Sequence, residues 1–294
     1  MSTDVAGLAG PRFREVGEAR RIGRVAAAVI LWLILATIAL STLYPLVFLA
    51  ATALRTTQDY RSSPAGIPHH LTLDNIHLAF SEVEIGKLAL NSVVVVAPAV
   101  IIVTVLSCLA AYALVHFRFP LRRTTLVIVV ALMALPPAVL LIPIFKIVLD
   151  AHLLNNRLGL ILVYAALNLP FSIFLLASFM RSVPDELLNA AKIDGAGALR
   201  TLWSVVIPLV RPGLLTLITL NFLFMWNEFL YALVILQKET NRTIMVGIAQ
   251  FQGHWEKNLG VVSAGLLLSM IPPLLIFLFF QRDLARGLTS GAVK

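Results

Sequence analysis

Long apolar runs separated by short polar stretches make up most of the chain. Six of these runs are long enough to cross a bilayer as helices, because about 20 apolar residues at about 1.5 Å each span the hydrocarbon core. We expect the spans at about Val25–Leu54, Leu88–Phe117, Thr124–Leu149, Leu160–Met180, Leu214–Leu236 and Leu259–Phe280. The pattern therefore predicts an all-α polytopic membrane protein with six transmembrane helices.

Polar stretches divide the chain into segments. We expect an N-terminal tail at residues 1–24, the first transmembrane helix with a following loop at 25–86, a transmembrane core at 87–282 and a C-terminal tail at 283–294. The core is interrupted by a charged loop at 182–208. With 59% hydrophobic and only 13% charged residues, the composition excludes a soluble globular protein.

The positive charges lie mainly on one face of the predicted bundle. Of the 23 Lys and Arg residues, 15 fall in the two tails, the 118–123 turn and the 182–208 loop or at the flanking positions Arg181, Arg211 and Arg282, all of which six spans place on one side. The positive-inside rule makes this side cytoplasmic, so both termini are expected in the cytoplasm and the loop within 25–86 outside. Membrane orientation thus accounts for the net charge of +8, and no nucleic-acid partner is expected.

Several predicted spans contain prolines, which remove helix hydrogen bonds. Pro136, Pro137 and Pro143 fall in the third span, and Pro272 and Pro273 in the sixth. In a membrane, the freed carbonyls must be satisfied by neighbouring groups, water or a cavity. For the third span two interpretations remain open, a simple packing kink or a deformable helix along a solute pathway.

The 182–208 loop begins with the pattern of a short helix and a glycine elbow. Pro184 stands where a first helical turn tolerates a missing N–H, and Glu186 follows near the positive end of the helix dipole. Gly195 and Gly197 then end the helix, because glycine adopts positive φ without a Cβ penalty.

A second short amphipathic helix is predicted after this elbow, ended by Pro208. Its apolar positions recur at helical spacing, at Leu199, Leu202, Trp203 and Val206. The two short helices are expected to lie outside the bilayer between two spans. Periodicity alone also permits an amphipathic linker that rests on the membrane surface.

The residues of this loop resemble the coupling loop, or EAA loop, of binding-protein-dependent ABC importer permeases. That pattern reads Glu-Ala-Ala, a glycine four residues after the last alanine, nine residues, an aliphatic, any residue, an aliphatic and a proline. The matching positions are Asn189, Ala190, Ala191, Gly195, Val205, Ile207 and Pro208, and Asp194 beside the glycine matches as well. Asn189 stands where the family usually has glutamate, which bears on any ion pair from this position to an ATPase but not on the fold of the loop.

Two further segments resemble the carbohydrate, maltose-type branch of this family. Trp226–Phe229 is similar to its fifth-span signature, and Gly287–Lys294 to the C-terminal end of its permease subunit. The resemblance implies a type I importer fold in the inner membrane, and sugar import with a second permease, two ATP-binding subunits and an extracytoplasmic solute-binding protein. It also implies that Leu199, Leu202 and Trp203 dock on the ATPase, which binds the ATP and Mg²⁺.

Glu228 is an ionised group deep within a predicted span. Burying it costs about 2.5–3.5 kcal/mol on insertion scales, so it should face a partner or a cavity. Asn221 and Asn227 lie on nearby turns of the same helix. An interhelical hydrogen bond between subunits, a position along the solute pathway, and extension towards the outer surface all remain open for Glu228.

The sequence lacks the motifs of the common catalytic and metal sites. It has no glycine-rich phosphate loop ending in Lys-Ser or Lys-Thr and no zinc-protease histidine pair, so ATP must be hydrolysed by a partner. Cys108 is expected to be a small buried hydrophobe, and the adjacent His69 and His70 to be surface residues. The chain is therefore not expected to be an enzyme or to hold a metal.

Two rival classes can be weighed against these features. An ion-coupled secondary transporter would be expected to show inverted repeats and several intramembrane ionisable residues, and the chain shows only Glu228 and no evident repeat. An intramembrane enzyme would need a nucleophile–base or metal constellation within the spans, which is missing.

Overall fold

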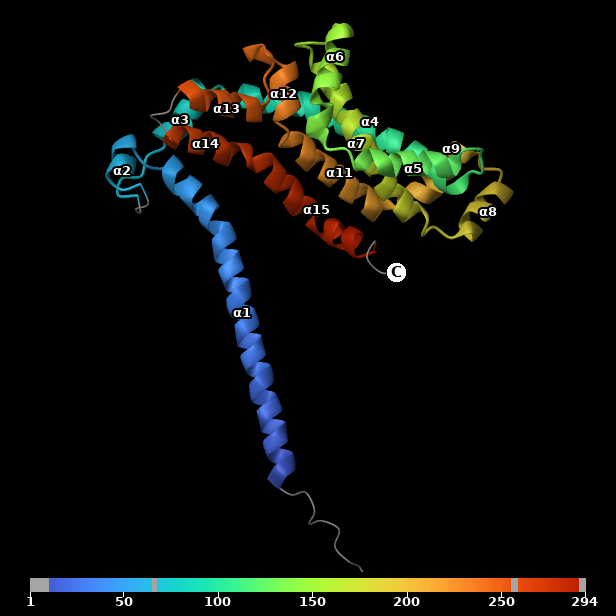
Figure 1. Ribbon diagram of the computed structural model, residues 1–294, viewed down its shortest axis with the longest axis horizontal. Helices are drawn as coiled ribbons and strands as arrows, with labels where there is room; N and C mark the ends of the chain where they lie inside the picture. Colours follow the sequence, from blue (N-terminus) through green and yellow to red (C-terminus); the bar gives the residue numbers. More distant parts are fainter. Residues whose placement is uncertain (1–10, 65–67, 255–258, 291–294) are drawn as a thin grey trace, which may run out of the picture.

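The computed structural model describes residues 11–64, 68–254 and 259–290, and every regular element in these ranges is a helix (Figure 1). The first half contains α1 (Pro11–Ala53), α2 (Thr57–Ser62), α3 (Asp74–Ser81), α4 (Ile85–His116), α5 (Arg122–Met133), the 3₁₀ helix η1 (Pro137–Leu140), α6 (Leu141–Asp150) and α7 (Arg157–Met180). The second half contains α8 (Asp185–Ile193), α9 (Ala198–Thr201), the π-helix η2 (Leu202–Val206), α10 (Ile207–Leu209), α11 (Arg211–Trp226), α12 (Leu230–Ile235), the 3₁₀ helix η3 (Glu239–Asn241), α13 (Ile244–His254), α14 (Leu259–Ser269) and α15 (Ile271–Ser290). The predicted all-α class is confirmed.

Four helices are long and apolar enough to cross a membrane by themselves. They cover Ala27–Ala53, Ile85–His116, Arg157–Met180 and Leu259–Leu284, and match the first, second, fourth and sixth predicted spans. Two further candidates are bent helix pairs, α5 with η1 and α6 at 96° and α9–α10 with α11 at 84°. The described residues therefore contain four candidate spans, and up to six if each bent pair is one span.

The first helix starts inside the segment expected to form the N-terminal tail, at Pro11. Its apolar stretch buries none of its side chains against the rest of the chain, and Figure 1 shows α1 leaving the bundle at an angle. Only the C-terminal end of α1 is anchored, where the buried Thr52 and Ala53 lie next to α14 and α3. The chain thus leaves a long apolar helix for lipid or another subunit to cover.

Buried Arg55 organises the loop that follows α1. Its guanidinium donates to the carbonyls of Ser63 (3.1 Å) and Pro64 (2.6 Å) and stacks over the Tyr60 ring, 4.5 Å from its centroid. Asn75 of α3 donates to the Arg55 carbonyl at 2.8 Å. The described parts of the predicted loop thus form a cap that contains α2 and α3, and these hydrogen bonds satisfy backbone groups the turns leave free.

The core is built around α4 and α7, with α11 packed beside them and α15 packed against α11. The larger of its apolar clusters runs from Ile85 of α4 to Trp226 and Ile244, and a second one lies towards the other end of α4, around Cys108. Cys108 is 1% exposed, as expected for a small buried hydrophobe. The α13 helix, which lies between the fifth and sixth predicted spans, also packs into the core, because its apolar side chains face α4.

The break in the sixth span shows how this core meets a backbone requirement. In a continuous helix the Ser269 carbonyl would accept from residue 273, but Pro273 has no N–H. Instead the indole N–H of buried Trp226 donates to this carbonyl at 3.0 Å. A tryptophan of the fifth span thereby satisfies a carbonyl that a proline frees in the sixth.

Candidate functional site

The 182–208 loop forms the predicted helix and elbow. The first helix, α8, ends in a Schellman motif, in which the Ala196 amide donates to the Ala191 carbonyl (2.9 Å) and the Gly195 amide to the Lys192 carbonyl (3.1 Å). Gly195 has a φ of +76°, which confirms the predicted positive-φ elbow. Gly197 differs from the prediction, since its φ of −67° is open to any residue.

The second half of the loop is helical but not regular. It passes from α9 through the π-turn η2 into α10, so that the helix continues past Pro208 and ends at Leu209. The Ile207 amide donates five residues back, to the Leu202 carbonyl, instead of four. This wider turn gives room for the Pro208 ring, which in a regular helix would meet the carbonyl of Ser204.

Buried side chains fix the loop to the membrane helices. Leu188 of α8 and Leu202 and Val206 of η2 pack in the cluster that also contains Cys108 of α4 and Leu176 of α7. Leu202 was expected on the docking face but is 0% exposed, because the π-turn directs it inward with this cluster. The loop is thus a rigid extension of α4 and α7.

The outer surface of the loop carries apolar side chains with no cover. Ile193, Leu199 and Trp203 are 86%, 63% and 49% exposed. Ile193 was not anticipated, because it lies off the apolar stripe of α8 and directly before the elbow. The remaining predicted loop residues divide into exposed ones, Glu186, Asn189, Ala190, Asp194 and Pro208, and the buried Ala191.

Glu228 occupies a break in the expected fifth span. The span is not continuous, since α11 ends at Trp226 and α12 begins at Leu230. The Glu228 carboxylate accepts from the backbone amides of Tyr231 (2.8 Å) and Ala232 (3.1 Å), and so caps α12. It also accepts from the hydroxyl of Tyr164 on α7 at 2.8 Å. The partner expected for this charge therefore lies within the chain.

The two neighbouring asparagines have different settings. Asn221 is fully buried and donates to the Ser172 hydroxyl at 2.9 Å, so it joins α11 to α7 and is not available to a second subunit. Asn227 is exposed, and its side chain donates back to the Leu223 carbonyl at 2.8 Å. Glu228 lines the cavity described in the next paragraph, and Asn221 and Asn227 do not.

The break in the third span lies next to the break at Glu228. The chain turns by 96° between α5 and the η1–α6 segment, much more than a packing kink. The Tyr231 hydroxyl donates to the carbonyl of Pro137 at 2.7 Å and so ties the two breaks together. Between them lies a cavity of about 460 Å³, which is within the size range of small-molecule sites.

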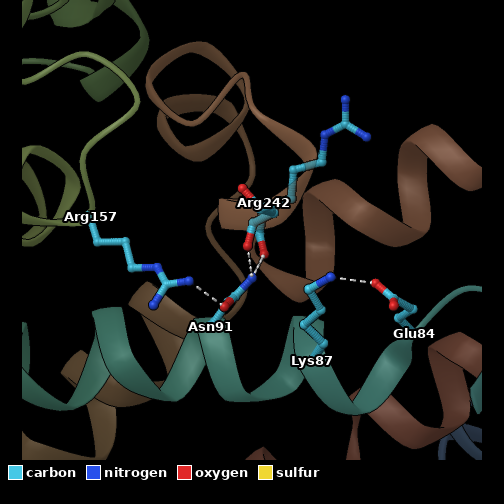
Figure 2. Close-up of polar contacts among 6 residues, drawn as sticks. Glu84, Lys87, Asn91, Arg157 and Arg242 are labelled. Atoms are coloured by element: carbon cyan, nitrogen blue, oxygen red, sulfur yellow. Dashed lines mark hydrogen bonds and ion pairs between the residues drawn. The ribbon is translucent and has the colours of Figure 1, made fainter.

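A second polar cluster lies near the N-terminal end of α4, and Figure 2 shows its residues. The 182–208 loop packs towards the other end of this helix, near Cys108. Asn91 donates to the carbonyls of Thr240 and Arg242, each at 3.0 Å, and accepts from Arg157 at 2.8 Å. Beside it, Lys87 pairs with Glu84 at 2.7 Å. Since these bonds join α4, the start of α7 and the 239–243 segment, the cluster holds this end of the bundle together.

In the part of the chain that the structure describes, no three His, Cys, Asp or Glu side chains come together as a metal site. His69, one of the two adjacent histidines, has its backbone amide bound to a carboxylate: the amide donates to Asp59 Oδ2 at 2.9 Å. This hydrogen bond is the main reason that the pKa of Asp59 is lowered from its usual value.

The C-terminal end of the segment Gly287–Lys294, residues 291–294, lies outside the described residues.

Comparisons with known proteins agree with this arrangement. Residues 103–290 match the model of the family described as binding-protein-dependent transport system inner membrane component. The chain is 33% identical over 270 residues to the diacetylchitobiose uptake system permease protein NgcG of Streptomyces coelicolor, which covers 91% of this chain and 87% of that protein. It is 34% identical over 266 residues to the trehalose transport system permease protein SugB of Mycobacterium tuberculosis, with 90% and 97% covered.

Among solved structures, the fold is similar to a chain of a bacterial ABC transporter involved in the import of the acidic polysaccharide alginate. The TM-score is 0.75 at 24% identity, and the match covers 90% of this chain and 97% of that one. At this identity the likeness shows the fold alone.

Proposed function

The chain belongs to the family of binding-protein-dependent transport system inner membrane components, and from this we propose that it is a permease subunit of an ATP-driven importer of a sugar or related solute. The sugar class follows from the relatives, which are named for diacetylchitobiose and trehalose. The chain is thus a transport subunit, and ATP and Mg²⁺ are bound by its partner.

The 182–208 loop is the observation that carries this proposal. Ile193, Leu199 and Trp203 expose apolar surface outside the predicted spans, where uncovered apolar groups mark an interaction site. The base of the loop, in contrast, is packed against α4 and α7. A force applied to the tip by an ATPase must therefore move α4 and α7 with it, as a rigid-body change at subunit interfaces.

The remaining partners in the proposal are a second permease, two ATP-binding subunits and an extracytoplasmic solute-binding protein. The uncovered apolar stretch of α1 offers a large surface to the second permease or to lipid. The Thr216 hydroxyl of α11 donates to the Asp283 carbonyl of α15 at 3.2 Å, which supports placing the C-terminal end of α15 on the same side as the loop.

We assign this side to the cytoplasm on the charge asymmetry of the sequence. Single cysteines placed in a Cys108→Ser background test the orientation in intact cells. A cysteine replacing the exposed Ala151 should react with a membrane-impermeant thiol reagent added outside, and one replacing Lys192 should not. The reverse labelling pattern would overturn the orientation.

Charge substitution at the tip tests ATPase docking. Ile193→Asp should reduce the ATPase that co-purifies with the permease pair, because it places a carboxylate in the apolar contact. The matched control is Leu71→Asp, since Leu71 is a comparably exposed side chain (76%, against 86% for Ile193) in the loop after α1. Equal ATPase retention in both variants and the wild type would show that the loop is not the docking site.

A further inference from the structure

We propose that the cavity between the two broken spans is a binding subsite for a neutral, hydroxyl-rich unit of the transported solute. The inference rests on the proposed function and adds a site and a charge preference to it. The cavity measures about 460 Å³ and is walled by α5, η1, α7 and the α11–α12 break. This volume suits one or two sugar rings and not a long polymer.

The polar groups on the wall offer hydrogen-bond acceptors and almost no donors. Tyr164 gives its hydroxyl proton to Glu228, and Tyr231 gives its proton to the Pro137 carbonyl. Both hydroxyl oxygens therefore keep only lone pairs for a ligand. Asn168 uses one N–H on the Tyr164 carbonyl, at 2.9 Å, which leaves its side-chain oxygen as an acceptor. A ligand that matches this wall must bring many donors, as the hydroxyl groups of a sugar do.

The charge on the wall sets the second requirement. Glu228 lines the cavity, and none of the residues lining it is Lys, Arg or His. Within the described ranges, no salt bridge to Glu228 is formed. A carboxylate, sulfate or phosphate on the solute would meet a like charge with no cation among the lining residues to offset the repulsion. The cavity thus favours neutral over acidic sugars.

Aromatic rings supply the apolar part of the site. Phe171 and Phe224 line the cavity edge to face, with ring centroids 6.4 Å apart, and Tyr164 and Tyr231 complete the aromatic set. The C–H faces of a pyranose pack on such rings, while its hydroxyls reach the acceptors. A lipid chain or an apolar helix of a partner could fill the same space, but neither brings donors for the acceptors beside Glu228.

The test uses the assembled complex of permeases and ATPases without the solute-binding protein, so that specificity comes from the membrane part alone. Met133, a cavity residue, is replaced by cysteine in a Cys108→Ser background, and its alkylation by N-ethylmaleimide is followed. Trehalose or diacetylchitobiose should slow the reaction in a concentration-dependent way, and a disaccharide containing a uronic acid should not. Ile142→Cys, on exposed α6 and outside the cavity, controls for reagent access.

A second substitution tests whether protection from alkylation depends on the polar groups that line the cavity. Tyr231→Phe removes one acceptor, and should raise the disaccharide concentration needed for half-protection by about five- to tenfold, as expected for a hydrogen bond. Tyr112→Phe, the same change in the cluster near the 182–208 loop, should leave it unchanged.

The outcomes separate the subsite from the proposed function. Equal protection by neutral and acidic sugars, or no protection by either disaccharide in a complex that transports one of them with its binding protein, would overturn the subsite alone. Slow alkylation of Met133→Cys that no sugar affects would point to lipid or a partner helix instead. A complex with its binding protein that transports no sugar at all would overturn the proposed function.

Discussion

Replacing Gly195 by valine is the sharpest perturbation of the 182–208 loop. A Cβ at this position would meet no heavy atom within 4 Å, so a new side chain causes no steric clash. The positive φ of +76° is the constraint, and the Schellman hydrogen bonds of 2.9 and 3.1 Å depend on it. The substitution therefore tests the elbow conformation and not packing.

The expected size follows from backbone strain. An L-residue in the left-handed region costs about 1–2 kcal/mol, and a β-branched side chain lies at the upper end of this range. Such a cost lowers the ratio of native to alternative elbow conformations by about five- to thirtyfold. Since Ile193 and Leu199 lie on either side of the elbow, its loss separates the two halves of the proposed docking surface, and affinity for the ATPase should fall by a similar factor.

The structure provides two matched controls. Gly197→Val places the same side chain two residues on, where φ is −67° and no atom lies within 4 Å, and it should bind the ATPase like the wild type. Gly195→Asn should retain most of the binding, because asparagine tolerates positive φ. ATPase binding to the purified permease pair and solute uptake are measured at equal expression. If Gly195→Val and Gly197→Val bind equally, the elbow conformation does not matter for coupling.

Three further predictions concern polar groups within the chain. Glu228→Ala should destabilise the protein by about 2–3 kcal/mol, since two backbone amides and a tyrosine lose their acceptor, and should lower the melting temperature in detergent more than Phe229→Leu does. Trp226→Phe should cost about 1–3 kcal/mol because the Ser269 carbonyl loses its donor, and unchanged thermal stability would contradict this role. Asp59→Asn should be destabilising at about pH 6 and nearly neutral well below pH 4: the lowered pKa means that ionised Asp59 stabilises the fold above its ordinary pKa, and that this stabilisation is lost as the pH falls through the folded value. A melting-temperature difference that does not shrink on acidification would refute the assignment.

Local signals were sufficient for the helices that are continuous. The apolar runs predicted the α4 and α7 spans closely, and the charged residues after Pro184 with the glycine at 195 predicted α8 and its end. Each of these elements is specified by features within it, such as length, a cap and a stop residue. Helical spacing could not predict that Leu199 is exposed and Leu202 buried, because it places both side chains on one face. Leu202 is buried by the π-turn and the neighbouring apolar cluster, which the spacing does not reveal.

The broken spans were missed for a different physical reason. The apolar runs are continuous through both the third and the fifth span. Hydropathy therefore identifies residues that lie in the membrane, but it does not show whether the helix they form is continuous. The prolines of the third span indicated some deviation, but nothing local indicates the size of the bend, 96°, or the hydrogen bond to Pro137 from Tyr231, 94 positions along the chain. In the fifth span there is no proline between Trp226 and Leu230, and the intramembrane charge of Glu228 was the only local sign that backbone amides needed a new acceptor.

The two halves of the proposed mechanism meet in α7. At its C-terminal end, Leu176 and Met180 pack with the loop residues Leu188 and Leu202, and near its N-terminal end Tyr164 holds Glu228 at the cavity. A rigid displacement of the loop would therefore move Tyr164 with α7 and load its hydrogen bond to Glu228 at the break in the fifth span. Because the same tyrosine supplies an acceptor to the cavity, ATP-driven movement of the loop would alter the proposed solute subsite directly, without a separate relay.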